Sequence, residues 1–493
     1  MALDASTCYR ALAARDSRFD GRFFTAVLTT GIYCRPVCPA RTPRRENVRF
    51  FPCAAAAEKE GFRACRRCRP DAAPGTPAWA GTSATVARAL RLISDGILDE
   101  RPVEALSGRL GVGERHLRRL FRHELGASPA EIAATRRVHF ARRLLRETEL
   151  PVADVAFSAG FRSIRRFNEA FREAFDCRPA EYRRATGERP PSERELSLRL
   201  PYQPPYRWSE LSRFLSARAI PGVESFDGGR YRRSFTAGRS AGVLEVGPVR
   251  GEDALELRVP PVGTAELLAI SARARRLFDV DADVATIARD LARDPALARD
   301  VRSAPGIRIP GSWDPFEIAV RAVLGQQVTI SAATTLVGRV VRALGEPLPS
   351  PEGDVTHLFP EPSDVADADL AGIGIPARRA AALRALAGAF ARGEIDGLAA
   401  KGVDAFVAGL TEIPGIGPWT AHYIAMRALS EPDAFPAGDL WLRRLIEPGT
   451  TLPAAAVEER SAAWRPWRAY AAFYLWRRAA GRKEERNSWK SRN

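Results

Sequence analysis

The pattern of apolar positions divides the chain into two helical regions separated by a short region of alternating residues. Residues 82–187 carry apolar side chains at three- and four-residue spacing between glycine turns, which predicts short amphipathic helices. Residues 197–262 include AGVLEVGPVR and ALELRV, whose alternation predicts strands, together with one helix. From residue 263 to about residue 480 the pattern is almost entirely helical. The fold class expected is therefore multidomain and mainly α.

The first helical region contains an internal repeat. The segment PVEALSGRLGVGERHLRRLFRHELG, which begins at Pro102, returns as PVADVAFSAGFRSIRRFNEAFREAFD, which begins at Pro151. Each copy is an apolar helix, a glycine turn and an arginine-rich helix, the pattern of a helix-turn-helix. We expect recognition helices near residues 114–124 and 163–175. Their arginines either contact DNA or form solvated faces.

Composition favours a polyanionic partner. The 493 residues carry a formal net charge of +16, and with the repeat this indicates double-stranded DNA. No run approaches the ~18 to 20 apolar residues that a membrane span needs, and the N-terminus is too charged for a signal peptide, so we expect a cytoplasmic protein.

Three histidines of the repeat region have no companion ligand in the sequence and are expected at the surface or near phosphates: His116, His123 and His139.

The seven cysteines are clustered, which in a reducing compartment favours metal over disulfides. Two close pairs, Cys34 with Cys38 and Cys65 with Cys68, are separated by 26 residues. This spacing predicts a four-thiolate tetrahedral zinc site, and by spacing alone the zinc could be purely structural. The other cysteines are expected to be small buried hydrophobic residues: Cys8, Cys53 and Cys177.

Residues 410–444 predict a helix, a tight hairpin, a second helix, a loop and a carboxylate that opens a third helix. Gly415 and Gly417 are expected to turn the backbone with positive φ and to leave the N–H groups of the second helix free, a seat for phosphate. Asp439 follows a Pro-Ala-Gly breaker and precedes LWLRR. An aspartate in that position is most often a helix N-cap, so this residue alone leaves two roles open.

Aromatic residues gather in the same part of the chain. Trp419 and Tyr423 are four residues apart on one helix face, and Trp467, Tyr470 and Trp476 come from a segment near the C-terminus. Aromatic residues at helical spacing usually belong to a core, and a binding pocket is the alternative.

Residues 16–71, with TTGIYCRPVCPAR and GFRACRRCRPD, closely resemble the N-terminal domain of the adaptive-response protein Ada. The resemblance implies that the four paired cysteines hold zinc and that Cys34 accepts a methyl group from a DNA methylphosphotriester. Four thiolates on Zn²⁺ carry a formal charge of about −2, so methylation would lower repulsion from DNA. The repeat, with its connecting helix RRVHFARRLLRE, resembles the AraC-type DNA-binding domain.

The hairpin, with WDPFEIAVRAVLGQQVTISAA upstream, resembles the AlkA-type 3-methyladenine glycosylases of the helix-hairpin-helix superfamily, over a region that ends near residue 478. The resemblance implies Asp439 as the catalytic carboxylate and Gln327 as the side chain that fills the gap left by a flipped base. It also implies a base pocket formed by Trp419, Tyr423 and Trp476, and DNA binding by Gly415 and Gly417.

At several positions this sequence differs from related repair families, and these differences restrict the reactions expected of it. Trp419 stands where bifunctional members carry a Schiff-base lysine, so no lyase step is expected. No cysteine follows Cys177, which argues against the iron–sulfur cluster of the endonuclease III branch. No Pro-Cys-His-Arg string is present, so an O6-alkylguanine transferase domain is not expected. Arg477 follows Trp476 where enteric members have a tyrosine, which leaves substrate breadth open.

The combined prediction is an alkylation-response protein that senses phosphotriesters, activates transcription by contact with RNA polymerase, and excises alkylated purines as a monomer. The alternatives are a pure regulator with a degenerate glycosylase half, and a repair enzyme whose other parts only tether it to DNA. The expected units are a small zinc-bound α+β domain, a double helix-turn-helix, a small α+β domain, a helical glycosylase domain and a basic tail, at residues 1–75, 82–187, 197–262, 263–480 and 481–493.

Overall fold

The computed structural model describes residues 4–16, 19–65, 67–68, 70, 84–94, 96–186, 196–237, 240–260, 266–447 and 449–490. Of the segments between the expected units, residues 76–81 and residues 188–195 lie outside the described residues. None of the helices in the described ranges is long and apolar enough to cross a membrane.

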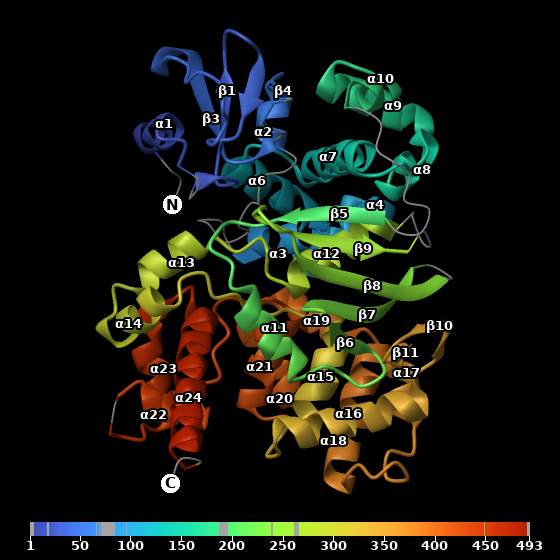
Figure 1. Cartoon of the computed structure of the whole chain (residues 1–493), viewed down its shortest axis with the longest axis vertical. Coiled ribbons are helices and arrows are strands. Elements are labelled where there is room, and N and C mark those ends of the chain that lie inside the picture. The colour runs from blue at the N-terminus through green and yellow to red at the C-terminus, as the bar shows by residue number, and fades with distance from the viewer. Residues whose placement is uncertain are drawn as a thin grey trace.

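The N-terminal unit is a small sheet of four strands flanked by two helices (Figure 1). The strand order is β3-β1-β2-β4, with β1 antiparallel to β2 and β3, and β2 parallel to β4. Its elements are α1 (Ala5–Ala13), β1 (Phe24–Val27), β2 (Ile32–Cys34), β3 (Val48–Phe51), α2 (Ala54–Lys59) and β4 (Arg63–Ala64). Because β2 ends at Cys34, the sheet fixes the position of the first paired cysteine.

Eight helices follow, and the repeat is visible in their packing. They are α3 (Ala84–Ser94), α4 (Ile97–Glu100), α5 (Val103–Leu110), α6 (Glu114–Leu125), α7 (Pro129–Glu147), α8 (Val152–Ser158), α9 (Ile164–Phe175) and α10 (Pro179–Thr186). The helices α6 and α9 lie where the repeat predicts recognition helices. Each buries three apolar side chains at the same register and leaves its arginines exposed on the other face.

His139 corrects an expectation. It is buried, with Nε2 2.8 Å from Glu58 Oε1 and 3.1 Å from Tyr33 Oη. Its carboxylate partner belongs to α2 of the N-terminal unit, so the sequence near His139 could not reveal it. Burial acts to raise the pKa of Glu58, but His139 and the hydroxyl donors outweigh burial and lower it. His116 and His123 are exposed, as expected.

The next unit is a five-stranded antiparallel sheet with strand order β5-β9-β8-β7-β6. Its elements are β5 (Leu196–Pro201), α11 (Trp208–Ser216), β6 (Glu224–Asp227), β7 (Arg230–Ala237), β8 (Ser240–Pro248) and β9 (Ala254–Val259). Helix α7 packs on β5, where the Arg199 N–H donates to Glu147 Oε2 at 3.0 Å. One continuous apolar cluster runs from the N-terminal unit through α7 and α9 into this sheet.

Beyond β9 the described residues are mainly helical, with one β-hairpin among them. In Figure 1, α22, α23 and α24 form one group, and α15, α16, α18, α20 and α21 form another. The elements are α12 (Leu267–Leu277), α13 (Val284–Leu291), α14 (Pro295–Ser303), α15 (Pro315–Leu324), α16 (Ile330–Leu344), β10 (Pro347–Glu352), β11 (Val355–His357), α17 (Pro362–Asp367), α18 (Ala377–Ala391), α19 (Glu394–Lys401), α20 (Val403–Thr411), α21 (Pro418–Ala428), α22 (Leu440–Leu445), α23 (Ala454–Ser461) and α24 (Arg468–Lys490).

The expected basic tail differs from the structure. Helix α24 continues without a break to Lys490. Its last turns are built from arginine, lysine and glutamate, which are good helix formers, and no proline interrupts them. Residues 481–490 are therefore part of α24 instead of a separate segment.

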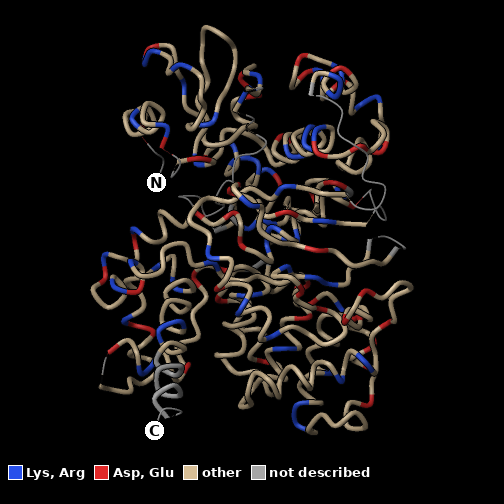
Figure 2. Tube along the Cα trace, in the orientation of Figure 1, with Lys and Arg blue, Asp and Glu red and all other residues tan. Residues whose placement is uncertain are grey.

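The units before residue 187 contact the helical region that follows the five-stranded sheet. Arg22 pairs with Asp283 at 3.0 Å, and Arg91 pairs with Glu431 at 3.1 Å. Helix α5 also packs on α19. Figure 2 shows basic and acidic residues interspersed over all parts of the chain, so the positive net charge is not confined to one unit.

Candidate active site and metal centre

An open cleft of about 2290 Å³ is lined by residues of both helix groups and of α11. Such a volume exceeds that of a small-molecule pocket and suits a segment of a polymer. The cleft brings together every residue that the sequence placed in the repair site: Gln327, Gly415, Gly417, Trp419, Tyr423, Asp439 and Trp476.

The hairpin between α20 and α21 uses one left-handed glycine instead of two. Gly415 has φ 91°, and a Cβ there would lie 2.8 Å from the Ala382 Cβ. Gly417 has φ −92° and ψ 171° and is the N-cap of α21. The expectation of positive φ at Gly417 was wrong, because an N-cap adopts extended backbone geometry. Gly417 is exposed, and a Cβ there would meet open space.

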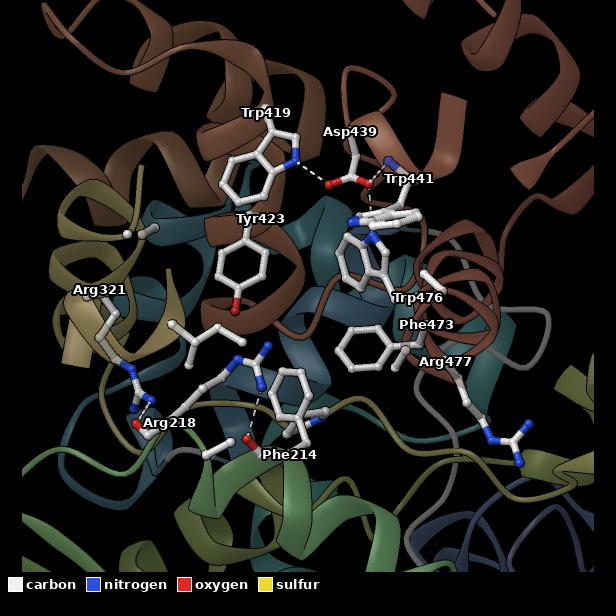
Figure 3. A pocket seen from close by; sticks show the side chains of 18 of the residues that line it. Phe214, Arg218, Arg321, Trp419, Tyr423, Asp439, Trp441, Phe473, Trp476 and Arg477 are labelled. Atoms are coloured by element: carbon white, nitrogen blue, oxygen red, sulfur yellow. Dashed lines mark hydrogen bonds between the residues drawn. The ribbon is translucent and has the colours of Figure 1, made fainter. Parts of the chain in front are cut away.

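Asp439 is the N-cap of α22, and its carboxylate has further partners. Oδ1 accepts from the backbone N–H groups of Trp441 at 2.9 Å and Leu442 at 3.1 Å. The indole N–H groups also donate, Trp476 to Oδ1 and Trp419 to Oδ2, each at 3.1 Å. The contacts with the two backbone N–H groups therefore confirm that Asp439 caps α22. The two indoles in addition hold the carboxylate at the edge of an aromatic pocket (Figure 3).

The pocket walls are aromatic. The Trp419 and Tyr423 rings stack with centroids 5.3 Å apart and an interplanar angle of 6°. The Trp476 ring is 6.5 Å from that of Tyr423 at an angle of 54°. These three side chains are half-buried and line the cleft, whereas Trp467 and Tyr470 are buried in the core. The core interpretation thus holds for two of the aromatic residues and not for the other three.

Three arginines that the sequence did not single out lie on the side of the pocket away from Asp439. Arg218 and Arg321 line the cleft (Figure 3), and Arg427 is buried behind Tyr423. Arg427 Nη1 donates to Tyr423 Oη at 2.8 Å, and Arg321 donates to the Arg218 carbonyl. Burial acts to raise the pKa of Tyr423, but the charges of the three guanidiniums outweigh burial and lower it below its usual value. Since the chain is rich in arginine, no local signal distinguished these three.

The segment between α15 and α16 forms another edge of the cleft. Gln327 is exposed and has φ 54°, a left-handed conformation that is uncommon for a side-chain-bearing residue. The preceding Gln326 donates through Nε2 to the Gly415 carbonyl at 2.9 Å and to Thr420 Oγ1 at 3.1 Å. Strained backbone of this kind is often retained at functional sites. The tie to the hairpin fixes Gln327 relative to Asp439.

Arg477 does not form part of the aromatic wall. Its Nε lies 3.0 Å from Glu210 Oε2, and Nη1 donates to Ser303 Oγ at 3.3 Å. The side chain therefore reaches α11 and α14, and Figure 3 shows it pointing away from Asp439.

The four paired cysteines converge in the N-terminal unit. The Sγ atoms of Cys34, Cys38, Cys65 and Cys68 all lie within 4.8 Å of one another. Tetrahedral zinc with Zn–S bonds of about 2.3 Å needs sulfurs about 3.8 Å apart, so the cluster fits this ion. Cys34 is half-buried, whereas the other three are buried, so Cys34 is the most accessible of the four.

The cysteines outside the cluster do not approach it. Cys8 is buried in a small apolar cluster. Cys53 is half-buried between α2 and α6, where its thiol donates to the Leu125 carbonyl at 3.3 Å. Cys177 is half-buried beside the main apolar cluster.

Comparison with known proteins accounts for each unit. Four family models match: the metal binding domain of Ada at residues 7–71, a helix-turn-helix domain at 106–185, the AlkA N-terminal domain at 197–314, and the HhH-GPD superfamily of base excision DNA repair proteins at 320–468.

Relatives span the whole chain or its repair half. The "Probable bifunctional transcriptional activator/DNA repair enzyme AlkA" of Mycobacterium tuberculosis is 44% identical over 96% of both chains. The DNA-3-methyladenine glycosylase 2 of Escherichia coli is 36% identical over 56% of this chain and 95% of its own. The solved 3-methyladenine DNA-glycosylase from Archaeoglobus fulgidus has 21% identity and a TM-score of 0.50, covering 56% of this chain and 96% of its own, which shows a common fold.

Proposed function

This chain belongs to the family of bifunctional transcriptional activators and DNA repair enzymes of the AlkA type, and we propose that its repair half excises alkylated purines with Asp439 as the catalytic carboxylate. DNA is its partner and zinc its cofactor. The observation that carries the proposal is the position of Asp439, held by two indole N–H groups at the edge of an aromatic pocket. Release of 3-methyladenine and 7-methylguanine from alkylated DNA by the purified chain tests it.

In the proposed reaction the damaged nucleotide leaves the duplex and its base enters the pocket. Trp419 with Tyr423 forms one wall for the base, and Trp476 forms the other. The bond between C1′ and the base nitrogen breaks, the base takes the electron pair, and positive charge grows on the sugar. Asp439 stabilises that charge and orients the attacking water, whose oxygen bonds to C1′ while its proton passes to the Asp439 carboxylate. Gln327 fills the gap left in the duplex.

The aromatic walls favour a cationic alkylated purine over a normal base by a cation–π attraction of ~0.5 to 2 kcal/mol. The three arginines at the far end of the pocket oppose part of this attraction because they carry the same charge. Most of the selectivity for damage therefore comes from the weakened glycosidic bond of the alkylated nucleotide. Pocket affinity contributes the smaller part.

Monofunctional excision is predicted, because a lyase step needs an amine beside C1′. No lysine is among the described residues that line the cleft, and Trp419 stands at the hairpin position. Borohydride should therefore trap no covalent complex between the chain and abasic DNA, under conditions that trap a glycosylase of the lyase type run in parallel. A trapped adduct would show that another amine reaches the sugar.

We also propose that Cys34 accepts a methyl group from a DNA methylphosphotriester. The support is its accessibility, since Cys38, Cys65 and Cys68 are buried. These four residues would hold zinc, which keeps bound thiols deprotonated at neutral pH. The chain is proposed to act as a cytoplasmic monomer that contacts RNA polymerase from the promoter, as expected of an activator.

Methylation of Cys34 should strengthen promoter binding, because it removes one negative charge near the DNA phosphates. The gain in affinity should shrink as salt rises, since exposed charges are screened within about 8 Å at 0.15 M. Titration of promoter DNA with methylated and unmethylated chain at two salt concentrations measures this effect. Equal affinities at low salt would contradict the electrostatic switch and favour a role of the N-terminal units in tethering alone.

A further inference from the structure

The far end of the base pocket is cationic. Arg427 is 2% exposed, and its guanidinium lies 5.7 Å from the Tyr423 ring centre and 5.1 Å from that of Phe214. The Arg218 guanidinium lies 3.8 Å from the Phe214 ring centre. Figure 3 shows Arg218 and Phe214 on the side of the pocket opposite Asp439, with the Tyr423 hydroxyl pointing toward that side.

Two of these charges have no acidic partner. Arg321 pairs with Glu224 at 3.1 Å. Within the part of the chain that the structure describes, Arg218 and Arg427 form no ion pair with a carboxylate. Their guanidinium N–H groups donate to backbone carbonyl oxygens instead. Arg218 donates to the Phe214 carbonyl at 3.2 Å, and Arg427 donates to the Gly311 carbonyl at 3.2 Å. Burial lowers the pKa of both, yet a guanidinium stays charged in proteins. An occupant that brings a hydrogen-bond acceptor would therefore lower the free energy of this end of the pocket.

The groups that face the pocket there are donors. Arg427 Nη1 donates to Tyr423 Oη at 2.8 Å, so the phenol hydrogen is left to donate elsewhere. Arg218 donates to the described protein through Nη1 alone, so further N–H groups of its guanidinium remain for a ligand. The aromatic walls offer no acceptor of comparable strength.

A purine whose glycosidic nitrogen lies beside Asp439 directs its six-membered ring toward this donor end. A 6-oxopurine presents the O6 acceptor at that edge, whereas a 6-aminopurine presents N–H donors. We propose that the pocket reads the C6 substituent and favours 6-oxopurines over purines that lack this acceptor, with Arg218 as the specificity-determining residue. The inference rests on the proposed glycosylase function and names its preferred substrate class.

The test uses two uncharged bases, hypoxanthine and unsubstituted purine, which differ by the C6 oxygen and the hydrogen on N1 that accompanies it, placed at one position of the same duplex. Single-turnover excision rates give a hypoxanthine-to-purine ratio for each protein. Arg218→Met keeps the packing on Phe214 and should lower this ratio about tenfold, the size expected for one well-placed base contact. Arg218→Lys keeps the charge and should retain most of the ratio. Arg213→Met removes the same charge from an exposed residue at the cleft edge and should leave the ratio unchanged.

Release of 3-methyladenine, which has an amino group at C6, reports whether each variant is folded and active. If Arg218→Met no longer releases 3-methyladenine, Arg218→Gln replaces it in the comparison. The hypoxanthine-to-purine ratio of Arg218→Gln should be lower than that of the wild type and of Arg213→Met, and should still show some preference for hypoxanthine. A ratio equal to that of the wild type in a variant that still releases 3-methyladenine overturns the inference and leaves the glycosylase function standing. A wild-type chain that releases no base at all overturns both.

Discussion

Replacing Asp439 with asparagine is expected to slow single-turnover release of 3-methyladenine by ~10²-fold or more, while binding to lesion DNA is largely retained. The departing alkylpurine needs little assistance, so the charge to be stabilised is the one that grows on the sugar. Asparagine keeps the shape of the side chain but removes its negative charge. A loss of this size is typical when one electrostatic stabiliser is removed from an active site.

The competing account is that Asp439 only caps α22. Asparagine can cap through the same oxygen that accepts from Trp441 and Leu442, at a cost of at most about 1 kcal/mol in stability. Its amide group would face an indole N–H, so thermal unfolding should be measured beside the rate. Asp314 caps α15 in the same way, is exposed and does not line the cleft, so Asp314→Asn is the matched control. A rate for Asp439→Asn within a few-fold of the wild-type rate would show that Asp439 acts only as the N-cap of α22.

Replacing Cys34 with alanine is expected to abolish methyl uptake from phosphotriester DNA. In the proposed transfer the Cys34 thiolate attacks the methyl carbon, a sulfur–carbon bond forms, the carbon–oxygen bond breaks, and the phosphodiester leaves as an anion. Alanine has no nucleophile, and the three remaining cysteines of the cluster are buried. Intact-mass measurement before and after incubation with methylated DNA gives the uptake.

Two controls separate lost chemistry from lost structure. Cys8→Ala alters a buried cysteine outside the cluster and should leave methyl uptake unchanged. Zinc content and excision of alkylated bases should be measured on Cys34→Ala, because a retained repair half shows that the chain is folded. Peptide mapping that finds the methyl group of the wild type on Cys38, Cys65 or Cys68 would refute the assignment to Cys34.

Features set by nearby residues could be predicted from the sequence. The cysteine spacing identified the cluster, and the repeat located α6 and α9, because each depends on a local pattern. The cleft residues gathered as the family resemblance implied. The positive φ predicted for Gly417 was wrong, because glycine permits positive φ without requiring it.

Contacts between distant segments could not be predicted. His139 meets a carboxylate 81 residues earlier in the chain, and Arg218 meets an aromatic pocket built mainly from residues beyond 400. In an arginine-rich chain no composition signal separates a buried arginine from a solvated one. The packing of α7 on β5 likewise depends on surfaces whose partners only the folded chain reveals.

We propose that one chain both excises alkylated bases and accepts a methyl group. The most direct test incubates the purified chain with DNA carrying radiolabelled methyl groups, then measures label in free bases and label on the protein in the same reaction. We predict free 3-methyladenine and 7-methylguanine together with labelled protein, loss of only the free bases in Asp439→Asn, and loss of only the protein label in Cys34→Ala. Labelled protein without any released base from the wild-type chain would contradict the account and leave a regulator whose repair half is degenerate.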